Sequence, residues 1–302
     1  MKKLMLISNA NAGSVTAATR EIILKALQAD FKVEAVDTER RDHASDLALD
    51  AVDRDFDAVM AFGGDGTINE AMQPLVGTDL SFGFIPGGST NVAARSLGLP
   101  RDPVDATAHV AHRLLSHTRR RVNVGRIDRR FFLFSAGMGL DAEVVKRVEA
   151  NPEAKRKRGE WFFVSNAFKA GMTEYRTTKP RLKVTIDGEE SAEVILAVCG
   201  NARPFTYFKR FPVDVCPEAE LDKGLDFYAL RRLRASAVPR LISGLFVTGA
   251  HTRWRSSVYH HDVQGATFEA EQPTPVQVDG DYVGEWTSAR LELVPDALNL
   301  LV

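Results

Sequence analysis

The stretch FGGDGTINEAM, residues 62–72, contains three glycines around one aspartate, between an apolar run and a helical pattern. The apolar run Ala58–Phe62 is typical of a buried strand. After Gly66, apolar residues at positions 68, 71, 72 and 75 have the spacing of one helix face, and Pro74 limits how far that helix can run. The stretch therefore predicts a strand, a tight loop and a helix in that order.

The same alternation of apolar runs and helical patterns fills the first third of the chain. The apolar runs lie at Leu4–Ser8, Phe31–Val36, Ala58–Phe62 and Phe82–Ile85. Strands that alternate with helices form βαβ units, in which the strands are parallel. We therefore expect an N-terminal α/β domain built on a doubly wound parallel sheet.

Short β-type runs dominate from about Val122 onward. They lie at Phe131–Phe134, Arg181–Ile186, Val194–Val198, Leu225–Leu230, Val258–Phe268, Thr274–Val278 and Arg290–Leu293. Gly, Asp or Pro often separates them, which is typical of antiparallel strands, and one helical pattern interrupts them near Trp161–Met172. The expected fold class is α/β followed by an all-β domain.

Composition argues against several classes of protein. Charged residues make up 26% of the 302 residues and the net charge is −1, so bulk charge does not indicate a nucleic-acid partner. Cys199 and Cys216 are too few for a disulfide scaffold and do not have a metal-site spacing, which favours a reducing, cytoplasmic setting. No apolar run approaches the roughly 18 residues of a membrane-spanning helix, so any membrane contact is expected to be peripheral.

The glycine loop at residues 63–66 suits a phosphate group. Glycines let the backbone approach a ligand closely, and the start of a helix offers unpaired N–H groups and the positive end of its dipole. Asp65 would repel a phosphate unless Mg²⁺ bridges the two, because hard cations bind carboxylate and phosphate oxygens together. The alternative is a plain turn in which Asp65 caps the helix.

A second stretch, FIPGGSTNVAAR at residues 84–95, also runs from a strand through small residues into a helix. Parallel neighbouring strands would bring both loops to the carboxyl edge of the sheet, where ligands bind in open α/β folds. Ser89, Thr90 and Asn91 offer hydroxyl and amide groups for phosphate or ribose. The alternative is that Ser89 or Thr90 serves only as an N-cap.

A third glycine pattern, Gly137-Met-Gly-Leu-Asp-Ala142, has the G-x-G-x-x-A spacing of dinucleotide sites. It lies in the β-rich half rather than in a βαβ unit, so a bend between a strand and a helix is the favoured interpretation. The G-x-x-x-x-G-K-[ST] spacing of P-loops is absent from the sequence.

Four segments, in this order, resemble the diacylglycerol kinase catalytic family: GGDGTINE, IPGGSTNVAAR, Ser135–Asp141 and Val278–Asp281. The family includes bacterial soluble lipid kinases, sphingosine kinases and ceramide kinases, and it is related to NAD kinases. The resemblance implies an α/β nucleotide-binding (kinase catalytic) domain at residues 1–122, joined by a C-terminal strand at 288–302. It implies an antiparallel β-sandwich for the lipid substrate at residues 123–287.

The resemblance also implies an activity and a set of site residues. The activity is ATP- and Mg²⁺-dependent phosphorylation of a lipid hydroxyl, with diacylglycerol as the default acceptor and phosphatidic acid as the product. The residues that would contact ATP are Asn9, Thr38, Gly63, Gly64, Asp65, Gly66, Thr67, Ile68, Asn69, Ser89 and Asn91. Asp65 would also hold the catalytic Mg²⁺, directly or indirectly.

Asp281 is the expected catalytic base. Phosphoryl transfer needs a carboxylate that orients the attacking hydroxyl and accepts its proton. The family has glutamate in an Asp-Gly-Glu motif; here the motif is Asp279-Gly280-Asp281, whose shorter last side chain displaces the acid by about 1 Å. The alternative is an Asp-Gly hairpin turn without a catalytic role.

Two further features bear on metals and partners. Lys223 replaces an aspartate with which family members hold a structural metal, and an ammonium group cannot ligate a metal. Lys155–Arg158, followed by Trp161–Phe163, would either touch an anionic membrane surface or form a solvated loop. The expected partners are a lipid substrate and, peripherally, the inner membrane face, with no nucleic acid. A homodimer is left open.

Two alternative functions remain at this point. One is an NAD-kinase-like or other small-alcohol kinase, which would share the GGDG-type loop. The other is a nucleotide-binding protein that has lost catalysis, because four positions depart from the family pattern. These positions are Ala10, Val92, Lys223 and Asp281.

Overall fold

The structure is a computed structural model that describes residues 1–13, 15–151, 182–189 and 191–302. The helix expected near Trp161–Met172 lies outside the described residues, and so does the basic and aromatic segment at Lys155–Arg158 and Trp161–Phe163.

The chain divides into two compact units. The first comprises residues 1–123 and 295–302, and the second comprises residues 124–294. The boundaries expected from the sequence are 122/123 and 287/288. The chain passes between the units twice, in the strands β5 (Arg120–Ile127) and β16 (Asp281–Leu300).

The first unit contains a parallel sheet with the strand order β2-β1-β3-β4, followed by the end of β16. The bounds are β1 (Lys3–Ser8), β2 (Lys32–Asp37), β3 (Ala58–Gly63) and β4 (Ser81–Pro86). In this register Phe62 lies beside both Ser8 and Ile85, so neighbouring strands end at the same level. β3 and β4 are buried throughout because helices cover both faces of the sheet.

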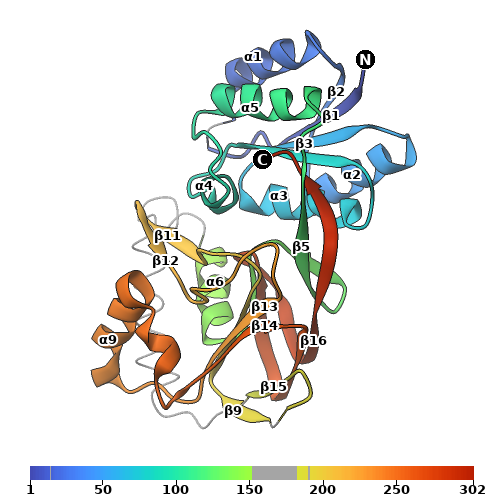
Figure 1. The fold of residues 1–302 in the computed structure, drawn as a ribbon. Coiled ribbons are helices and arrows are strands. Elements are labelled where there is room, and N and C mark those ends of the chain that lie inside the picture. Colours follow the sequence, from blue (N-terminus) through green and yellow to red (C-terminus); the bar gives the residue numbers. More distant parts are fainter. Residues whose placement is uncertain (14, 152–181, 190) are drawn as a thin grey trace. The chain divides into compact units, whose positions relative to one another are not determined.

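Helices lie on both faces of this sheet, which confirms the doubly wound α/β prediction (Figure 1). One face carries α1 (Ala17–Gln28) and α5 (Pro103–Leu115), which pack on each other. The opposite face carries α2 (His43–Asp53) and α3 (Asp65–Met72). Beyond α3, a 3₁₀ turn, η1 (Gln73–Leu75), contains Pro74, as expected for a residue that cannot continue the helix. A short helix, α4 (Val92–Ser96), follows β4.

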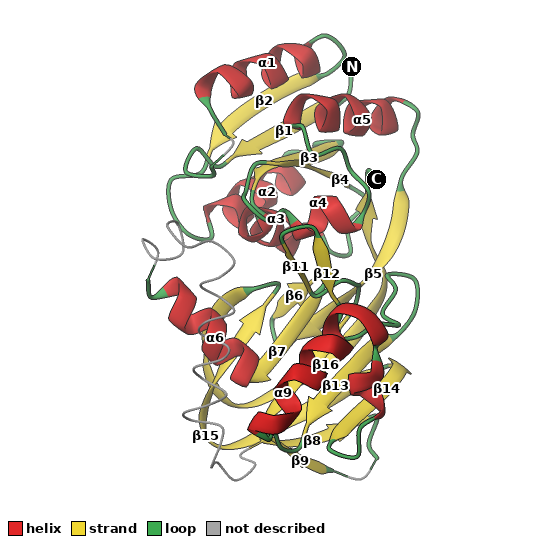
Figure 2. Cartoon of the chain, turned by 90° about the vertical axis from the view of Figure 1, so that its left-hand side faces the viewer, coloured by secondary structure: helices red, strands yellow, loops and turns green. Residues whose placement is uncertain are grey.

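The second unit is built mainly from antiparallel strands (Figure 2). The strand order is β14-β13-β10-β7-β15-β16, and β15 also pairs with β8. The remaining strands are β6 (Arg130–Phe132), β7 (Ser135–Gly139), β8 (Leu182–Ile186), β9 (Ala192–Val194), β10 (Leu196–Gly200), β11 (Thr206–Phe208), β12 (Phe211–Val213), β13 (Leu225–Leu230), β14 (Ser257–Val263) and β15 (Gly265–Val278). The helical elements are α6 (Leu140–Glu149), η2 (Ala235–Ala237), α9 (Val238–Ser243), η3 (Gly244–Thr248) and η4 (Ala250–Arg253). β15 contributes residues from both of its ends to one hydrophobic core. Phe268 and Val276 of β15 lie in this core together with Phe227 of β13.

Two of the predicted strands are wrong as single elements. Val194–Val198 is divided at Ile195 into β9 and β10, and Val258–Phe268 is divided at Gln264 into β14 and β15. The second break follows a change of partner, because β14 pairs with β13 whereas β15 pairs with β8. At that break the Asp187 carboxylate accepts hydrogen bonds from the N–H groups of Gln264 and Gly265.

The turn between β15 and β16 consists of Asp279 and Gly280, so an Asp-Gly hairpin turn is present. Both residues have positive φ, 49° and 86°, as a two-residue hairpin turn of the primed type requires. The Asp279 carboxylate accepts hydrogen bonds from the N–H groups of Leu133, Phe134 and Ser135, at 2.8–2.9 Å. Asp279 therefore fixes the start of β7 to the hairpin.

Candidate active site

The carboxyl ends of four parallel strands bring most of the predicted ATP contacts to one edge of the first unit. Asn9 follows β1, Thr38 follows β2, Gly64 follows β3 and Gly87 follows β4. β1 is the point where the winding reverses, since its neighbours are β2 on one side and β3 on the other. In open α/β sheets this switch point is the usual place for a ligand.

Three hydrogen bonds tie the first loops to neighbouring strands and to one another. The Asn9 side-chain amide donates to the hydroxyl of Thr67 at 3.0 Å, and the N–H of Asn9 donates to the carbonyl of Phe62. The N–H of Thr38 donates to the carbonyl of Ser8 at 2.8 Å. The structure thus joins Asn9 to Thr67 of the glycine loop and holds Thr38 beside the end of β1.

Most of the glycines serve contact between the two loops. The N–H of Gly87 donates to the carbonyl of Gly63 at 2.8 Å. A Cβ on Gly88 would lie 2.8 Å from the Cα of Gly64, and a Cβ on Gly63 would lie 2.7 Å from the Thr67 side chain. Gly88 lies backbone against backbone with Gly64, and Gly63 lies against the Thr67 side chain, so both positions require glycine for packing within the unit.

Gly64 is the exception, and it fits a phosphate group. A Cβ there would meet only the Cα of Gly88, at an ordinary 3.5 Å, and the φ of −87° suits any residue. Gly64 is also the N-cap of α3, and no side chain caps that helix. The first N–H groups of α3 therefore lie beside a glycine, where no side chain blocks the approach of an anion. A phosphate that binds at the start of a helix requires such open space.

Asp65 caps a different helix from the one expected. Its two carboxylate oxygens accept hydrogen bonds from the N–H groups of Val92 and Ala93 at the start of α4, at 3.0 Å each. Burial raises the pKa of Asp65, and these N–H groups oppose that shift. Since both oxygens bind backbone, direct coordination of Mg²⁺ by Asp65 does not fit well. Asp65 instead clamps the second loop to the first.

The second loop is closed by its own asparagine. Asn91 has a left-handed backbone with φ 48°, and its side chain both accepts from the N–H and donates to the carbonyl of Gly88. Ser89 is exposed and Thr90 is half-buried. Because Asp65 occupies the start of α4, the groups of this loop that face solvent are those of Ser89 and Thr90.

Two predicted ATP contacts are not placed with the others. Ile68 and Asn69 are each 2% exposed, and the N–H of Ile68 donates within the helix to the carbonyl of Gly64. The Asn69 side chain accepts a hydrogen bond from Gln73. Both side chains therefore serve the interior of the first unit.

Asp281 belongs to the second unit and is the first residue of β16. It pairs with Val278 across the turn, and its side chain is half-buried. The turn and its three hydrogen bonds depend on Asp279. Holding the hairpin is therefore the role of Asp279 rather than of Asp281.

Asp141 is a titratable residue to which the sequence analysis assigned no role. Its carboxylate lies over Gly137, where a Cβ would be 1.9 Å from Oδ2. Oδ2 accepts a hydrogen bond from the Gln277 amide at 3.2 Å, and Oδ1 is buried without a hydrogen-bond partner. Burial raises the pKa of Asp141 to about 7. The sequence signal for this contact is the spacing of Gly137 and Asp141, which lie four residues apart across the bend. The strand β7 and helix α6 confirm a bend here.

The turn that contains Lys223 is held by protein groups. Lys223 forms an ion pair with Glu220 at 2.9 Å, and the N–H of Gly224 donates to the Asp262 carboxylate at 2.6 Å. Asp226, fully buried, accepts from Tyr259 and contacts His261. Across the described part of the chain, no group of three or more His, Cys, Asp or Glu side chains has the arrangement of a metal site.

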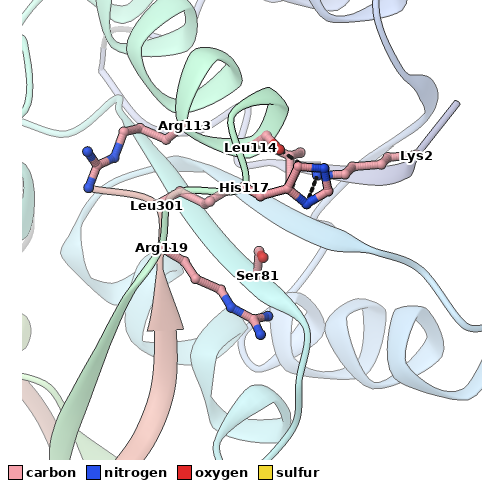
Figure 3. A pocket seen from close by; sticks show the side chains of 7 residues that line it. All are labelled: Lys2, Ser81, Arg113, Leu114, His117, Arg119 and Leu301. Atoms are coloured by element: carbon pink, nitrogen blue, oxygen red, sulfur yellow. Dashed lines mark hydrogen bonds between the residues drawn. The ribbon is translucent and has the colours of Figure 1, made fainter.

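A basic cavity of about 210 Å³ lies at the opposite edge of the parallel sheet (Figure 3). Lys2 precedes β1 and Ser81 begins β4, so this cavity is at the amino ends of the strands. The Lys2 ammonium group donates to the carbonyl of Leu114 in the last turn of α5, where a cation stabilises the helix dipole. The cavity is therefore separate from the loops at the carboxyl edge.

Two family models match the chain. The diacylglycerol kinase catalytic domain matches residues 3–127, and the YegS C-terminal NAD kinase beta sandwich-like domain matches residues 135–302. The chain belongs to the diacylglycerol kinase catalytic family. The two matches follow one another in the same order as the two units described above.

Individual relatives of this diacylglycerol kinase family align over most of the chain. A diacylglycerol kinase of Bacillus subtilis (strain 168) is 26% identical over 297 residues, which cover 94% of this chain and 91% of the relative. A diacylglycerol kinase of Mycobacterium tuberculosis (strain ATCC 25618 / H37Rv) is 30% identical over 285 residues, which cover 89% and 84%. The crystal structure of a diacylglycerol kinase from Bacillus anthracis str. Sterne has a TM-score of 0.75 at 22% identity and covers 99% of this chain and 96% of that one, which shows a shared fold.

Family membership establishes the class of reaction. The chain is a lipid kinase, that is, a phosphotransferase with an alcohol acceptor. The α/β fold and the C-terminal β domain expected from the sequence are confirmed. No helix within the described ranges is long and apolar enough to cross a membrane.

Gly64 and Gly88 provide a matched pair of variants for the candidate site. Gly88→Ala should reduce the free energy of unfolding by about 1–3 kcal/mol, because its Cβ would clash with the backbone of Gly64. Gly64→Ala should leave the melting temperature unchanged but weaken binding of an ATP analogue by about tenfold or more, a difference of ~1.4 kcal/mol. Calorimetric melting and titration with the analogue measure both. Unchanged affinity in Gly64→Ala would place the phosphates elsewhere.

Proposed function

We propose that the chain transfers the γ-phosphoryl group of ATP to the hydroxyl of diacylglycerol and releases phosphatidic acid and ADP. The observation that carries the proposal is the open backbone at Gly64 beside the uncapped start of α3. Phosphate oxygens suit such a site because they can accept several backbone hydrogen bonds at once. The relatives named diacylglycerol kinase support the choice of acceptor.

In this proposal the neighbouring loops hold the rest of the nucleotide. Asn9, Thr38 and Thr67 supply amide and hydroxyl groups beside the glycine loop, and Ser89 supplies a hydroxyl from the second loop. Asp65 acts through Val92 and Ala93, which it holds in place, so it is a positioning residue. Phosphoryl transfer depends mainly on such positioning and on charge stabilisation.

Asp281 is the proposed base of the transfer. Its carboxylate accepts the proton of the acceptor hydroxyl while that oxygen forms a bond to the γ-phosphorus. The bond between the γ-phosphorus and the β–γ bridging oxygen breaks, and ADP leaves with that oxygen. A carboxylate in this role orients the hydroxyl as well as accepting its proton.

Mg²⁺ is part of the proposal through the phosphates rather than through a protein cage. A bound Mg²⁺ would offset the negative charge of the β- and γ-phosphates. Both Asp65 oxygens already accept backbone hydrogen bonds, so contact through a water molecule suits this residue better than direct ligation. We further propose that the enzyme acts in the cytoplasm, on lipid at the inner membrane face; two buried free thiols, Cys199 and Cys216, accord with a reducing compartment.

Labelled ATP tests the proposed reaction. The purified protein should transfer γ-label to diacylglycerol in mixed micelles and give labelled phosphatidic acid, and chelation of Mg²⁺ should stop the transfer. Sphingosine, ceramide and NAD⁺ serve as parallel acceptors. Label on NAD⁺ alone would contradict a lipid acceptor, label on ceramide or sphingosine would change the acceptor, and ATP binding without any transfer would indicate lost catalysis.

A further inference from the structure

The second unit carries a surface that combines exposed apolar side chains with an excess of positive charge. It consists of the hairpin β11–β12 and the helical segment 238–248, which contains α9 and η3; we call it the hairpin–helix surface. Figures 1 and 2 both show the hairpin beside this helical segment. The N–H of Asp214 donates to the carbonyl of Leu245 at 2.9 Å, which joins the two parts.

Apolar side chains project from both parts of this surface. Phe211 and Ile242 are each 50% exposed, and Val247 is 82% exposed. Phe208 pairs with Phe211 across the hairpin, so both point to the same side, and the ring of Phe208 contacts Phe246 edge to face. No side chain of α9 is buried. Single exposed apolar residues are ordinary, whereas several on two joined elements indicate a binding surface.

The charge of the same region is one-sided. Its two parts, residues 206–213 and 238–248, contain Lys209, Arg210 and Arg240 and no aspartate or glutamate, in a chain whose net charge is −1. Lys209 and Arg210 form the turn of the hairpin, and the Arg210 guanidinium lies over the Phe211 ring at 5.2 Å. Arg203 is partly offset by Asp214, at 3.5 Å. The apolar tip of the hairpin is thus flanked by cations.

We infer that the hairpin–helix surface docks on an anionic lipid bilayer. Aromatic and aliphatic side chains enter the interface between headgroups and acyl chains, while the basic residues beside them contact anionic headgroups. A nucleic acid fits less well, because two of the three exposed apolar side chains, Ile242 and Val247, offer no ring for a base to stack on. A second copy of the chain fits less well too, because the two surfaces would repel each other.

This inference deepens the proposed function, since it names the surface through which a lipid kinase would reach a substrate held in a membrane. It extends the membrane contact expected from the sequence to residues that the sequence analysis did not consider. The binding test below uses neither ATP nor an acceptor lipid, so its outcome is independent of the proposed reaction.

Vesicle co-sedimentation tests the inference. We expect the full chain to bind vesicles of phosphatidylcholine mixed with an equal amount of phosphatidylglycerol at least about tenfold more tightly than vesicles of phosphatidylcholine alone, and more weakly as salt is added. The double variant Lys209→Glu and Arg210→Glu should weaken binding to the anionic vesicles by about 30-fold or more, since it reverses two charges. Equal binding to both vesicles would overturn the inference.

Matched apolar variants separate this surface from general hydrophobicity. The double variant Ile242→Ser and Val247→Ser should weaken vesicle binding by about tenfold or more. The control Ile22→Ser and Leu49→Ser changes residues of the first unit that are 52% and 48% exposed, and it should leave binding unchanged. Equal losses in both double variants would overturn the inference.

Further readouts of stability, activity and competing partners complete the test. Melting temperatures should match wild type in all variants, because the changed side chains are exposed. Phosphorylation of a dispersed short-chain diacylglycerol should also be unchanged, whereas phosphorylation of diacylglycerol in anionic vesicles should fall with binding. Displacement of bound vesicles by duplex DNA, or a loss of dimers in light scattering without a change in vesicle binding, would assign the surface to another partner.

Discussion

Asp281→Asn should lower the rate of lipid phosphorylation by about 10²- to 10⁴-fold, the range expected for loss of a general base. The amide keeps the size of the side chain but cannot take the proton of the attacking hydroxyl. The hairpin should survive, because Asp279 supplies the turn and accepts the three hydrogen bonds from residues 133–135. The affinity for an ATP analogue should be unchanged, since that site is proposed for the first unit.

Two variants sharpen this experiment. Asp281→Glu restores the carboxylate on the longer side chain of the family motif and should retain transfer. Asp279→Asn tolerates the left-handed backbone but removes an acceptor oxygen, so it should lower the melting temperature of the protein. Full turnover in Asp281→Asn would remove this residue from the mechanism, and a rate that falls only in step with the melting temperature would make its role structural.

Asp65→Asn should reduce both stability and transfer. Both carboxylate oxygens accept backbone N–H groups, and an amide would turn a donor toward either Val92 or Ala93. We expect a loss of about 1–3 kcal/mol in the free energy of unfolding, the cost of an unpaired buried group. Because α4 and the loop 87–91 would move, a displacement of about 1 Å should lower transfer by about 10²-fold.

Asp102→Asn is the matched control for Asp65. Asp102 caps α5 and uses a single oxygen, Oδ1, to accept from both Val104 and Asp105. Asparagine can supply that one acceptor and is itself a good N-cap, so stability and transfer should stay close to wild type. If Asp65→Asn keeps the melting temperature and regains activity with added Mg²⁺, then direct metal ligation would replace the positioning role.

The fold of the first unit could be predicted from the sequence to a large extent because β1 to β4 are short, apolar and separated by helical patterns. The four predicted parallel strands are present, and the second half is antiparallel as expected. The division at Gln264 could not be predicted, because it depends on a carboxylate from a distant turn, Asp187, and on a change of pairing partner. Apolar periodicity carries no information about either.

The candidate site was predictable in its loops but not in its contacts. The glycines at 63, 64, 87 and 88 are found at one sheet edge, yet three of them serve packing within the unit and only Gly64 leaves space for a ligand. The hydrogen bonds from α4 to Asp65 join residues that are far apart in the sequence. The local sequence pattern suggests only that Asp65 caps α3, the helix in which it lies. Asp141 gains its raised pKa from burial, which the sequence does not record.

The end of β16 has a consequence for synthesis on the ribosome. Asn299 and Leu300 pair with β4, and the N–H of Leu301 donates to the carbonyl of Phe82, so the last residues complete the sheet of the first unit. During translation β4 remains an open edge until the whole second unit has been made. The first unit therefore cannot complete its sheet before the second unit has been synthesised. A chain that ended after residue 123 would leave the edge of β4 exposed to other chains.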